Sequence, residues 1–309
     1  MIPARDCFEP VALLAAGAKL RAAVFAPDAA AKPRGICVLL NGRAEFVEKY
    51  FEVIDELRER GLAVATLDWR GQGGSARLVP DNPLKGHIDD FAEYDADLDA
   101  LMDQIVTPML AAAQRPIALA HSTGGHILLR YLNRHPDRFA ACAFSAPMLM
   151  FSTRGQPRWP VRVVTAVMVR AGRARDFVLG GGRDPLTMTF DDQLVTSDRA
   201  RFQRSQDILV EHPELRLAGP TWGWVAAALR SIARFAGNGY AETITTPVLI
   251  CGAGHDRICV TDDTRRFARR MPRASYLEIE DAEHEILMER DVFRQRWWSA
   301  FDDFMTDHI

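Results

Sequence analysis

Residues 116–132 read PIALAHSTGGHILLRYL, and their hydrophobic periodicity changes at one serine. The apolar run at 116–121 predicts a buried strand, and residues 124–136 carry the pattern of an amphipathic helix. Ser122 lies at the junction. It is either a nucleophile on a tight strand-to-helix turn, where the usual pattern is G-x-S-x-G, or a serine that caps the helix. Here the pattern is Ala120-His121-Ser122-Thr123-Gly124, with alanine at the first glycine position. The motif alone leaves both interpretations open.

The alternation of strand and helix continues on both sides of this serine. After a hairpin at 11–26, further strands are predicted at 35–42, 62–69, 141–147, 246–254 and 274–280, with helices at 45–61, 89–105, 262–271 and the C-terminus. Such alternation is typical of an α/β fold with a mostly parallel sheet and helices on both faces. Ligands of these sheets bind beyond the carboxyl ends of the strands.

The alternation of predicted strands and helices stops between about 148 and 240, where Arg, Gly, Pro and Trp are frequent. Helices are still predicted there, at 160–172 and 221–235. We therefore expect a core made of residues 1–147 and 241–309. We expect residues 148–240 to form a helical cap, or lid, inserted between two strands and lying over the carboxyl edge of the sheet.

Two polar residues follow later strands in the order that a serine nucleophile requires. A serine hydroxyl needs a base to take its proton, and the base needs an orienting acid. Asp256 follows the strand at 246–254, and His284 follows the strand at 274–280, in the order Ser, acid, His. This order is far more specific than the turn motif, so we expect Ser122, Asp256 and His284 to form a catalytic triad. His255 and His121 neighbour the triad positions, but their side chains are expected to point away from it.

An oxyanion site needs two backbone N–H groups near the nucleophile. The residue after the nucleophile supplies one, and a loop after an early strand supplies the other. The candidates are the N–H groups of Thr123 and Arg43, the latter in the loop after the strand at 35–42.

Composition narrows the function classes. The chain has 309 residues, 48% of them hydrophobic, and a net charge of −3, which gives no sign of nucleic-acid binding. Its five cysteines show no metal-ligand spacing and are expected to be reduced thiols. The N-terminus lacks the pattern of a secretory signal, and no run approaches the roughly 18 apolar residues of a membrane span. We expect a cytoplasmic protein without a bound metal or transmembrane segment.

The chain resembles the α/β-hydrolase superfamily, and within it the group of monoacylglycerol lipases and bacterial lysophospholipases. The similar segments are AHSTGG (120–125), LLNGRAEFVEKY (39–50), LDWRGQGGS (67–75), GHDRIC (254–259), AEHEIL (282–287) and the cap stretch 197–229. The chain departs from the group's motifs at Ala120, and at Asn41, Phe46 and Gln72, which replace histidines.

The resemblance implies a serine ester hydrolase that works without a cofactor. Its substrate would be a lipid-like ester, a lysophospholipid or a monoacylglycerol, cleaved through an acyl-enzyme on Ser122. Two interpretations stay open beside it. One is a general carboxylesterase of the same fold that acts on a non-lipid ester, and the other is a non-catalytic binding protein.

The cap carries the remaining signals. Residues 151–205 hold ten arginines, five aspartates and no lysine or glutamate, a net charge of +5. Such a segment favours a phosphate-bearing substrate or peripheral contact with an anionic membrane, unless it is simply a solvated face. Trp222 and Trp224 are candidate substrate contacts. Together with Val225, Val161, Val163, Val164, Val167 and Met168, they line either an acyl channel or the cap's own core.

Overall fold

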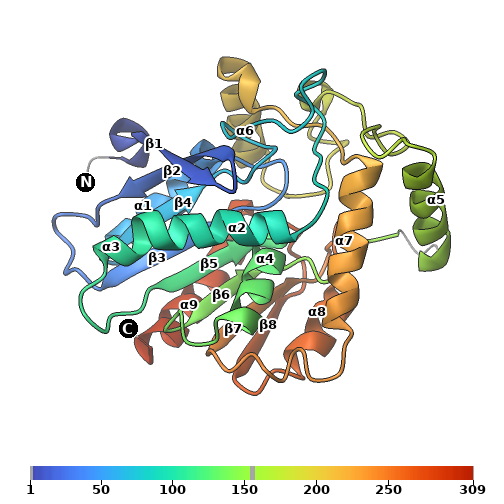
Figure 1. Ribbon diagram of the computed structural model, residues 1–309. Helices are drawn as coiled ribbons and strands as arrows, with labels where there is room; N and C mark the ends of the chain where they lie inside the picture. The colour runs from blue at the N-terminus through green and yellow to red at the C-terminus, as the bar shows by residue number, and fades with distance from the viewer. Residues whose placement is uncertain (1–2, 154–156, 309) are drawn as a thin grey trace.

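The computed structural model describes residues 3–153 and 157–308. In that part of the chain, eight strands form one sheet in the order β1-β2-β4-β3-β5-β6-β7-β8 (Figure 1). The strands are β1 Pro10–Ala15, β2 Ala18–Phe25, β3 Gly35–Leu40, β4 Leu62–Leu67, β5 Ile117–His121, β6 Cys142–Ser145, β7 Val248–Ala253 and β8 Ala274–Ile279. β1 and β2 pair antiparallel to their neighbours and the other pairs are parallel, so the predicted α/β sheet is confirmed.

Helices cover both faces of this sheet. They are α1 Phe51–Glu59, α2 Ala92–Leu101, α3 Thr107–Met109, α4 Ser122–Arg134, α5 Arg158–Arg170, α6 Arg199–Glu211, α7 Trp222–Phe235, α8 Thr261–Ala268 and α9 Asp291–Thr306. Shorter turns are η1 Ala4–Cys7, η2 Val47–Tyr50, η3 Met102–Val106, η4 Pro185–Thr187, η5 Pro213–Leu215 and η6 Ile286–Met288. In Figure 1, α2 and α4 lie in front of the sheet, and α1 and α9 lie behind it.

The central strands are buried on both faces, as parallel strands between two helical layers should be. Val38 and Leu40 of β3 point into the hydrophobic core shared with α2 and α4. Cys37 and Leu39 point into the core shared with α1 and α9. The continuous apolar run of β3 therefore reflects two cores. The strand ends at Leu40, and the loop that follows lies at the carboxyl edge of the sheet.

The segment between β6 and β7 holds α5, α6 and α7. α7 packs on the core through buried side chains that include Trp224 and Val225, and α5 packs against α7. α6 is a helix that the sequence analysis did not predict, because RARFQRSQDILVE carries only a weak apolar stripe. The division into a core and a cap of residues 148–240 stays a prediction.

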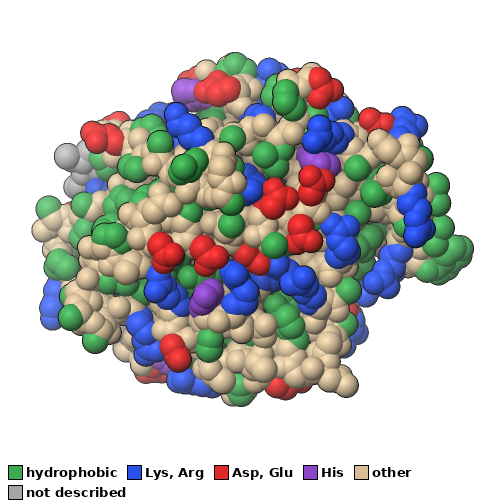
Figure 2. All heavy atoms as spheres, in the orientation of Figure 1, with side chains coloured by type: hydrophobic (Ala, Val, Ile, Leu, Met, Phe, Trp, Pro, Cys, Tyr) green, Lys and Arg blue, Asp and Glu red, His purple; other side chains and the backbone are tan. Residues whose placement is uncertain are grey.

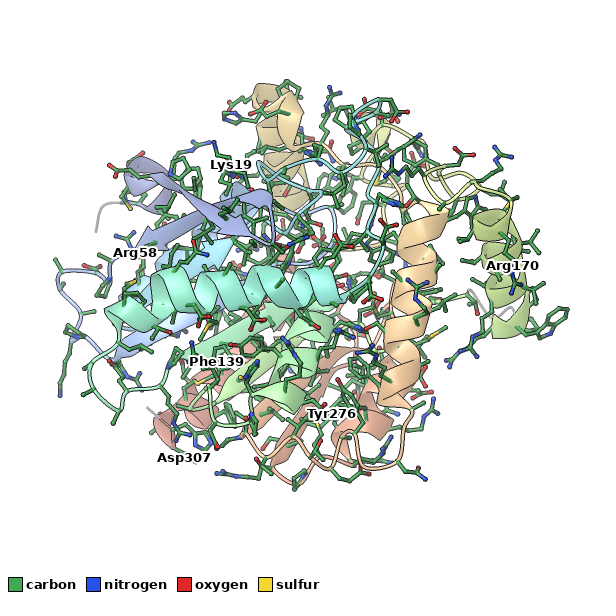
Figure 3. The ribbon with its side chains drawn as sticks, viewed as in Figure 1. Lys19, Arg58, Phe139, Arg170, Tyr276 and Asp307 are labelled. Carbon is green, nitrogen blue, oxygen red and sulfur yellow. The ribbon has the colours of Figure 1, made fainter. Side chains whose placement is uncertain are left out.

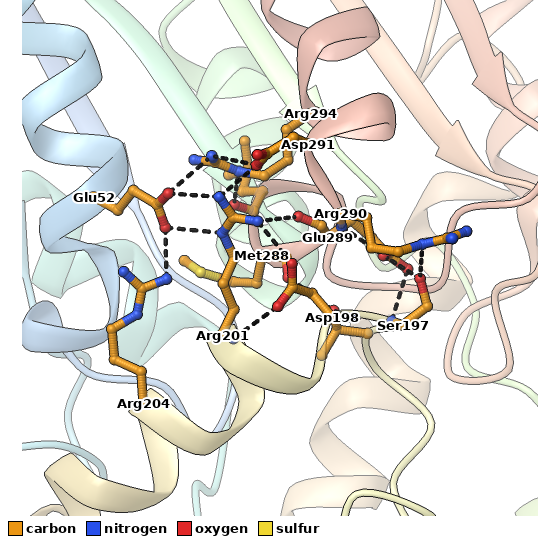
Figure 4. A network of polar contacts seen from close by, with 12 residues as sticks. Glu52, Ser197, Asp198, Arg201, Arg204, Met288, Glu289, Arg290, Asp291 and Arg294 are labelled. Carbon is orange, nitrogen blue, oxygen red and sulfur yellow. Dashed lines mark hydrogen bonds and ion pairs between the residues drawn. The ribbon is translucent and has the colours of Figure 1, made fainter.

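Ion pairs join α6 to the core (Figure 4). Asp198 caps the helix by accepting a hydrogen bond from the Arg201 N–H, at 2.9 Å. The Arg201 guanidinium donates to Glu52 of α1 at 2.6 Å and to Asp291 of α9 at 2.7 Å. Charged contacts thus seat α6 where its apolar stripe is weak. Every helix among the described residues is too short or too polar to span a bilayer.

Candidate active site

β5 ends at His121 and α4 begins at Ser122, so the serine occupies the turn itself. Its φ angle is +50°, in the left-handed region that non-glycine residues rarely adopt. Two residues later, a Cβ atom on Gly124 would lie 2.5 Å from the carbonyl oxygens of Leu40 and Asn41, so glycine is required there. Ala120 is fully buried in β5, and its methyl group is accommodated. The turn therefore has a strained serine that projects from the carboxyl edge.

The three residues expected to form a triad lie in hydrogen-bond contact. The distance from His284 Nε2 to Ser122 Oγ is 2.9 Å, and the distance from His284 Nδ1 to Asp256 Oδ2 is 2.7 Å. In the tautomer that fits both contacts, Nδ1–H donates to the carboxylate and Nε2 accepts from the serine hydroxyl. The arrangement suits transfer of the hydroxyl proton to the imidazole.

The helix-capping interpretation of Ser122 does not match the structure. The N-cap residue of α4 is His121, and its side chain makes no capping hydrogen bond. The Ser122 hydroxyl contacts the histidine instead of an N–H group of the first helical turn.

Burial and charge oppose each other at the histidine and its acid. Burial alone would lower the pKa of His284, but the Asp256 carboxylate, aided by Glu285 and Glu45, outweighs it, so the pKa is raised. Burial likewise disfavours the Asp256 anion. Contact with His284, and with the N–H groups of Cys259 at 2.7 Å and Ile258 at 2.8 Å, nevertheless lowers the pKa of Asp256. The acid is therefore held ionised beside the base.

The loop after β3 lines the same cavity as the serine. The Gly42 N–H donates to Glu45 Oε2 at 2.5 Å, and the Ala44 N–H donates to Gln72 Oε1 at 3.3 Å. The Arg43 N–H lies between these two fixed groups. Thr123 is in the first turn of α4, where N–H groups have no acceptor within the helix.

Sequence reasoning missed the side chains that hold this loop. Gln72 donates to the carbonyl oxygens of Gly42 at 2.8 Å and Glu45 at 3.1 Å. Lys49 joins Glu45 at 2.9 Å and Glu285 at 2.6 Å in a buried network. These residues lie in or beside the quoted family segments, and only their contacts across the fold reveal the network.

The departures from the family motifs have local partners. The Asn41 side-chain amide donates to Leu67 O at 3.1 Å, and the backbone carbonyl of residue 41 accepts from Trp69 Nε1 at 2.9 Å. Phe46 is buried against Ile208 and Leu209 of α6. The Asn41 side chain thus links the end of β3 to β4, and Phe46 packs against α6.

A cavity of about 370 Å³ opens onto Ser122 and His284. Its apolar walls include Met148, Phe151, Val195, Pro220, Trp224, Val225 and Ile258. Of the two candidate substrate contacts, Trp224 lines it, next to Val225. Trp222 is buried and lies outside the cavity lining. The residues of α5 also lie outside the lining, and Val163, Val164 and Val167 are exposed, which contradicts both their place in an acyl channel and their place in the cap's core.

His121, the residue before the serine, packs beside His284. The His121 ring lies 4.8 Å from the His284 ring, and its Nδ1 is 3.0 Å from Ser145 O. Burial lowers the pKa of His121 to about 4, so this ring is neutral when the triad works. The expectation that it points away from the site is wrong, since it lines the cavity.

Asp256, Cys259 and His284 bring three potential metal-ligand atoms within 4.8 Å of one another. Both ring nitrogens of His284 already have partners, Asp256 and Ser122. Burial raises the pKa of the Cys259 thiol well above its ordinary value, so the thiolate that a metal needs is disfavoured. The donor set fits a hydrogen-bonded triad better than a metal centre.

Comparisons with known proteins identify the family. The model of the Hydrolase_4 family, described as "Serine aminopeptidase, S33", matches residues 31–291. Lysophospholipase L2 of Escherichia coli (strain K12) is 33% identical over 281 residues, covering 88% of this chain and 81% of that protein. The monoacylglycerol lipase of Mycolicibacterium smegmatis is 27% identical, covering 80% and 79%.

A solved structure repeats the fold. A soluble variant of monoglyceride lipase from Saccharomyces cerevisiae superposes with a TM-score of 0.78 at 19% identity, covering 97% of this chain and 94% of that one. The resemblance noted from the sequence is therefore confirmed.

Proposed function

The chain belongs to the Hydrolase_4 family of α/β-hydrolases, and on that premise we propose that it is a serine hydrolase that cleaves the carboxylic ester of a lysophospholipid or monoacylglycerol. The observation that carries this proposal is the continuous contact from Asp256 through His284 to Ser122 beside an apolar cavity. A binding protein has no need of a strained serine in contact with a base and its acid.

The reaction proceeds in two halves. Ser122 Oγ attacks the ester carbonyl carbon while His284 Nε2 takes the hydroxyl proton, and Asp256 stabilises the imidazolium that forms. The N–H groups of Arg43 and Thr123 donate to the oxyanion. His284 then returns its proton to the leaving alcohol, which leaves an acyl group on Ser122.

Water completes the cycle. His284 takes a proton from a water molecule, the hydroxide attacks the acyl carbonyl, and the proton returns to Ser122 as the carboxylic acid leaves. The apolar walls around Trp224 and Val225 fit the hydrocarbon chain of a lipid ester, which distinguishes this proposal from a general carboxylesterase.

Labelling and a substrate panel test this function. A fluorophosphonate probe is expected to modify Ser122, and mass spectrometry would locate the label. Ser122→Ala should abolish labelling, whereas Ser145→Ala at the end of the neighbouring strand should retain it. The panel compares a lysophospholipid, a monoacylglycerol, a short-chain ester and an aminoacyl amide. A preference for the short-chain ester or the amide would refute the lipid assignment, and absence of labelling in folded protein would refute the enzyme.

We further propose that α5 makes the peripheral membrane contact. Trp159, Val163 and Val167 on this helix are 67%, 50% and 56% exposed. Figure 2 shows hydrophobic and basic side chains together at the right edge of the molecule, and Figure 3 places Arg170 on the outer helix. An exposed apolar face with arginines beside it suits the surface of an anionic bilayer.

The Arg-rich segment as a whole is less suited to that contact than its sequence suggested. Among its described arginines, Arg158, Arg173, Arg183, Arg199, Arg201 and Arg204 form ion pairs with carboxylates. Arg154 lies outside the described residues. The cytoplasmic location stays a prediction.

A further inference from the structure

The Arg43 side chain is half-buried and has no carboxylate partner among the described residues. Its Nη2 donates to the carbonyl oxygen of Ala218 at 2.6 Å, and its Cζ lies 5.4 Å from the centre of the Trp224 ring. Its Nε is buried and has no hydrogen-bond partner among the described residues. The same part of the chain offers no carboxylate within ion-pair distance of this side chain.

Arg43 also lies between two cavities. It lines the cavity that holds Ser122 and a second one, of about 300 Å³, between the loop after β3 and the segment around α6. The other cations on the described walls each have an acid partner. Lys49 contacts Glu45 and Glu285, Arg183 contacts Asp192, and Arg201 contacts Glu52.

A buried charge with no counter-charge is costly, and proteins usually pair or hydrogen-bond such groups. Burial lowers the pKa of Arg43 to about 10, which still leaves the guanidinium protonated at neutral pH. A bound anion would therefore supply the missing counter-charge. A phosphate group is well suited, because a guanidinium can donate to two of its oxygens at once.

The position of Arg43 indicates which part of a substrate meets it. Arg43 lines the same cavity as Ser122, while its side chain reaches Ala218 and Trp224 in the inserted segment. An ester bound with its carbonyl at Ser122 and its acyl chain on the apolar wall has its glycerol portion left to place. We place that portion beside Arg43, which lines both cavities.

We propose that the Arg43 side chain binds the phosphate of a lysophospholipid and makes the site prefer phosphate-bearing lysolipids to neutral monoacylglycerols. The inference rests on the proposed function for its substrate class and goes beyond it by naming the residue that selects the head group. The competing role is a clamp in which Arg43 merely holds the loop after β3 against Ala218.

Binding of uncleavable ethers separates these roles without depending on hydrolysis. Calorimetry would compare a short-chain ether analogue of a lysophospholipid with the matching alkylglycerol, which lacks the phosphate. Arg43→Met is expected to weaken binding of the phosphate ether about tenfold or more relative to the alkylglycerol. Arg43→Lys keeps the charge and should restore part of the preference. Arg183→Met, at a paired arginine of the second cavity, should leave the ratio unchanged.

Two results would overturn the proposal. One is an equal loss for both ethers in Arg43→Met, which identifies a clamp. The other is a wild-type protein that binds the phosphate ether no better than the alkylglycerol. A wild-type protein that cleaves no lipid ester refutes the proposed function, yet the ether ratio still decides the role of Arg43. The two failures are therefore distinct.

Discussion

The carboxyl edge of the sheet and the inserted segment between β6 and β7 are built in different ways. At the edge, short hydrogen bonds fix Ser122, His284 and Asp256 at the ends of strands. In the inserted segment, ion pairs seat α6 on the core, while α5 exposes an apolar face. We therefore expect the carboxyl edge to carry the chemistry and the inserted segment to influence which ester binds.

Ser122→Ala is the sharpest test of this separation. Removal of the nucleophile should lower kcat for any ester by about a million-fold, as in other triad enzymes. Binding to anionic vesicles should stay as in the wild type, because α5 is untouched. Steady-state kinetics and vesicle co-sedimentation measure the two quantities. A parallel loss of vesicle binding would contradict the separation.

Asp256→Asn should have the next largest effect, a fall in kcat of about 10,000-fold. The amide cannot hold the Nδ1–H tautomer of His284 or stabilise its cation. The exposed Asp262→Asn in α8 serves as the control and should retain activity. If the Asp256 variant kept most of its rate, another group would have to orient the base.

A double substitution on α5 tests the inserted segment. Val163→Asp with Val167→Asp puts two charges on the proposed membrane face and should weaken vesicle binding about tenfold or more. Hydrolysis of a short-chain ester in solution should not change. The control is Val210→Asp on α6, also an exposed valine. Equal vesicle binding by the α5 variant and the wild type would exclude this helix as the contact.

Arg201→Met tests how the inserted segment is held. Losing contacts to Glu52, Asp198 and Asp291 should lower the free energy of unfolding by about 1–2 kcal/mol, because the network is only partly shielded from solvent. Arg199→Met removes an exposed pair and should cost about 0–0.5 kcal/mol. Urea unfolding measures both. Equal losses would show that the network around Arg201 contributes no more to the free energy of unfolding than an exposed ion pair does.

How far the sequence predicts this molecule differs between the same two regions. The edge was predictable because strand periodicity places Asp256 and His284 at strand ends, where the fold must bring them together. In the inserted segment, α5 was predicted, but the inward orientation expected for Val163, Val164 and Val167 was wrong. An apolar helix face packs inward or stays exposed according to its tertiary neighbours, and the valines of α5 gave no sign of which. Arg43 was predicted only for its backbone, since the lack of a carboxylate partner depends on residues far away in the chain.

Glu285 contacts both regions, and its replacement gives the smallest expected effect. The Glu285 N–H donates to Val195 O of the inserted segment at 2.7 Å, and its carboxylate helps to raise the pKa of His284. The base must be neutral to act, so kcat/KM rises as pH increases through this raised pKa. Glu285→Gln removes a nearby negative charge, which favours the neutral imidazole and moves the low-pH limb toward lower pH. Asp256→Asn should move the limb of its residual activity further in the same direction, because Asp256 is the larger influence on this pKa. A pH profile with a soluble ester measures both shifts, and a limb that moves upward in Glu285→Gln would mean that Glu285 does not act on His284 through its charge.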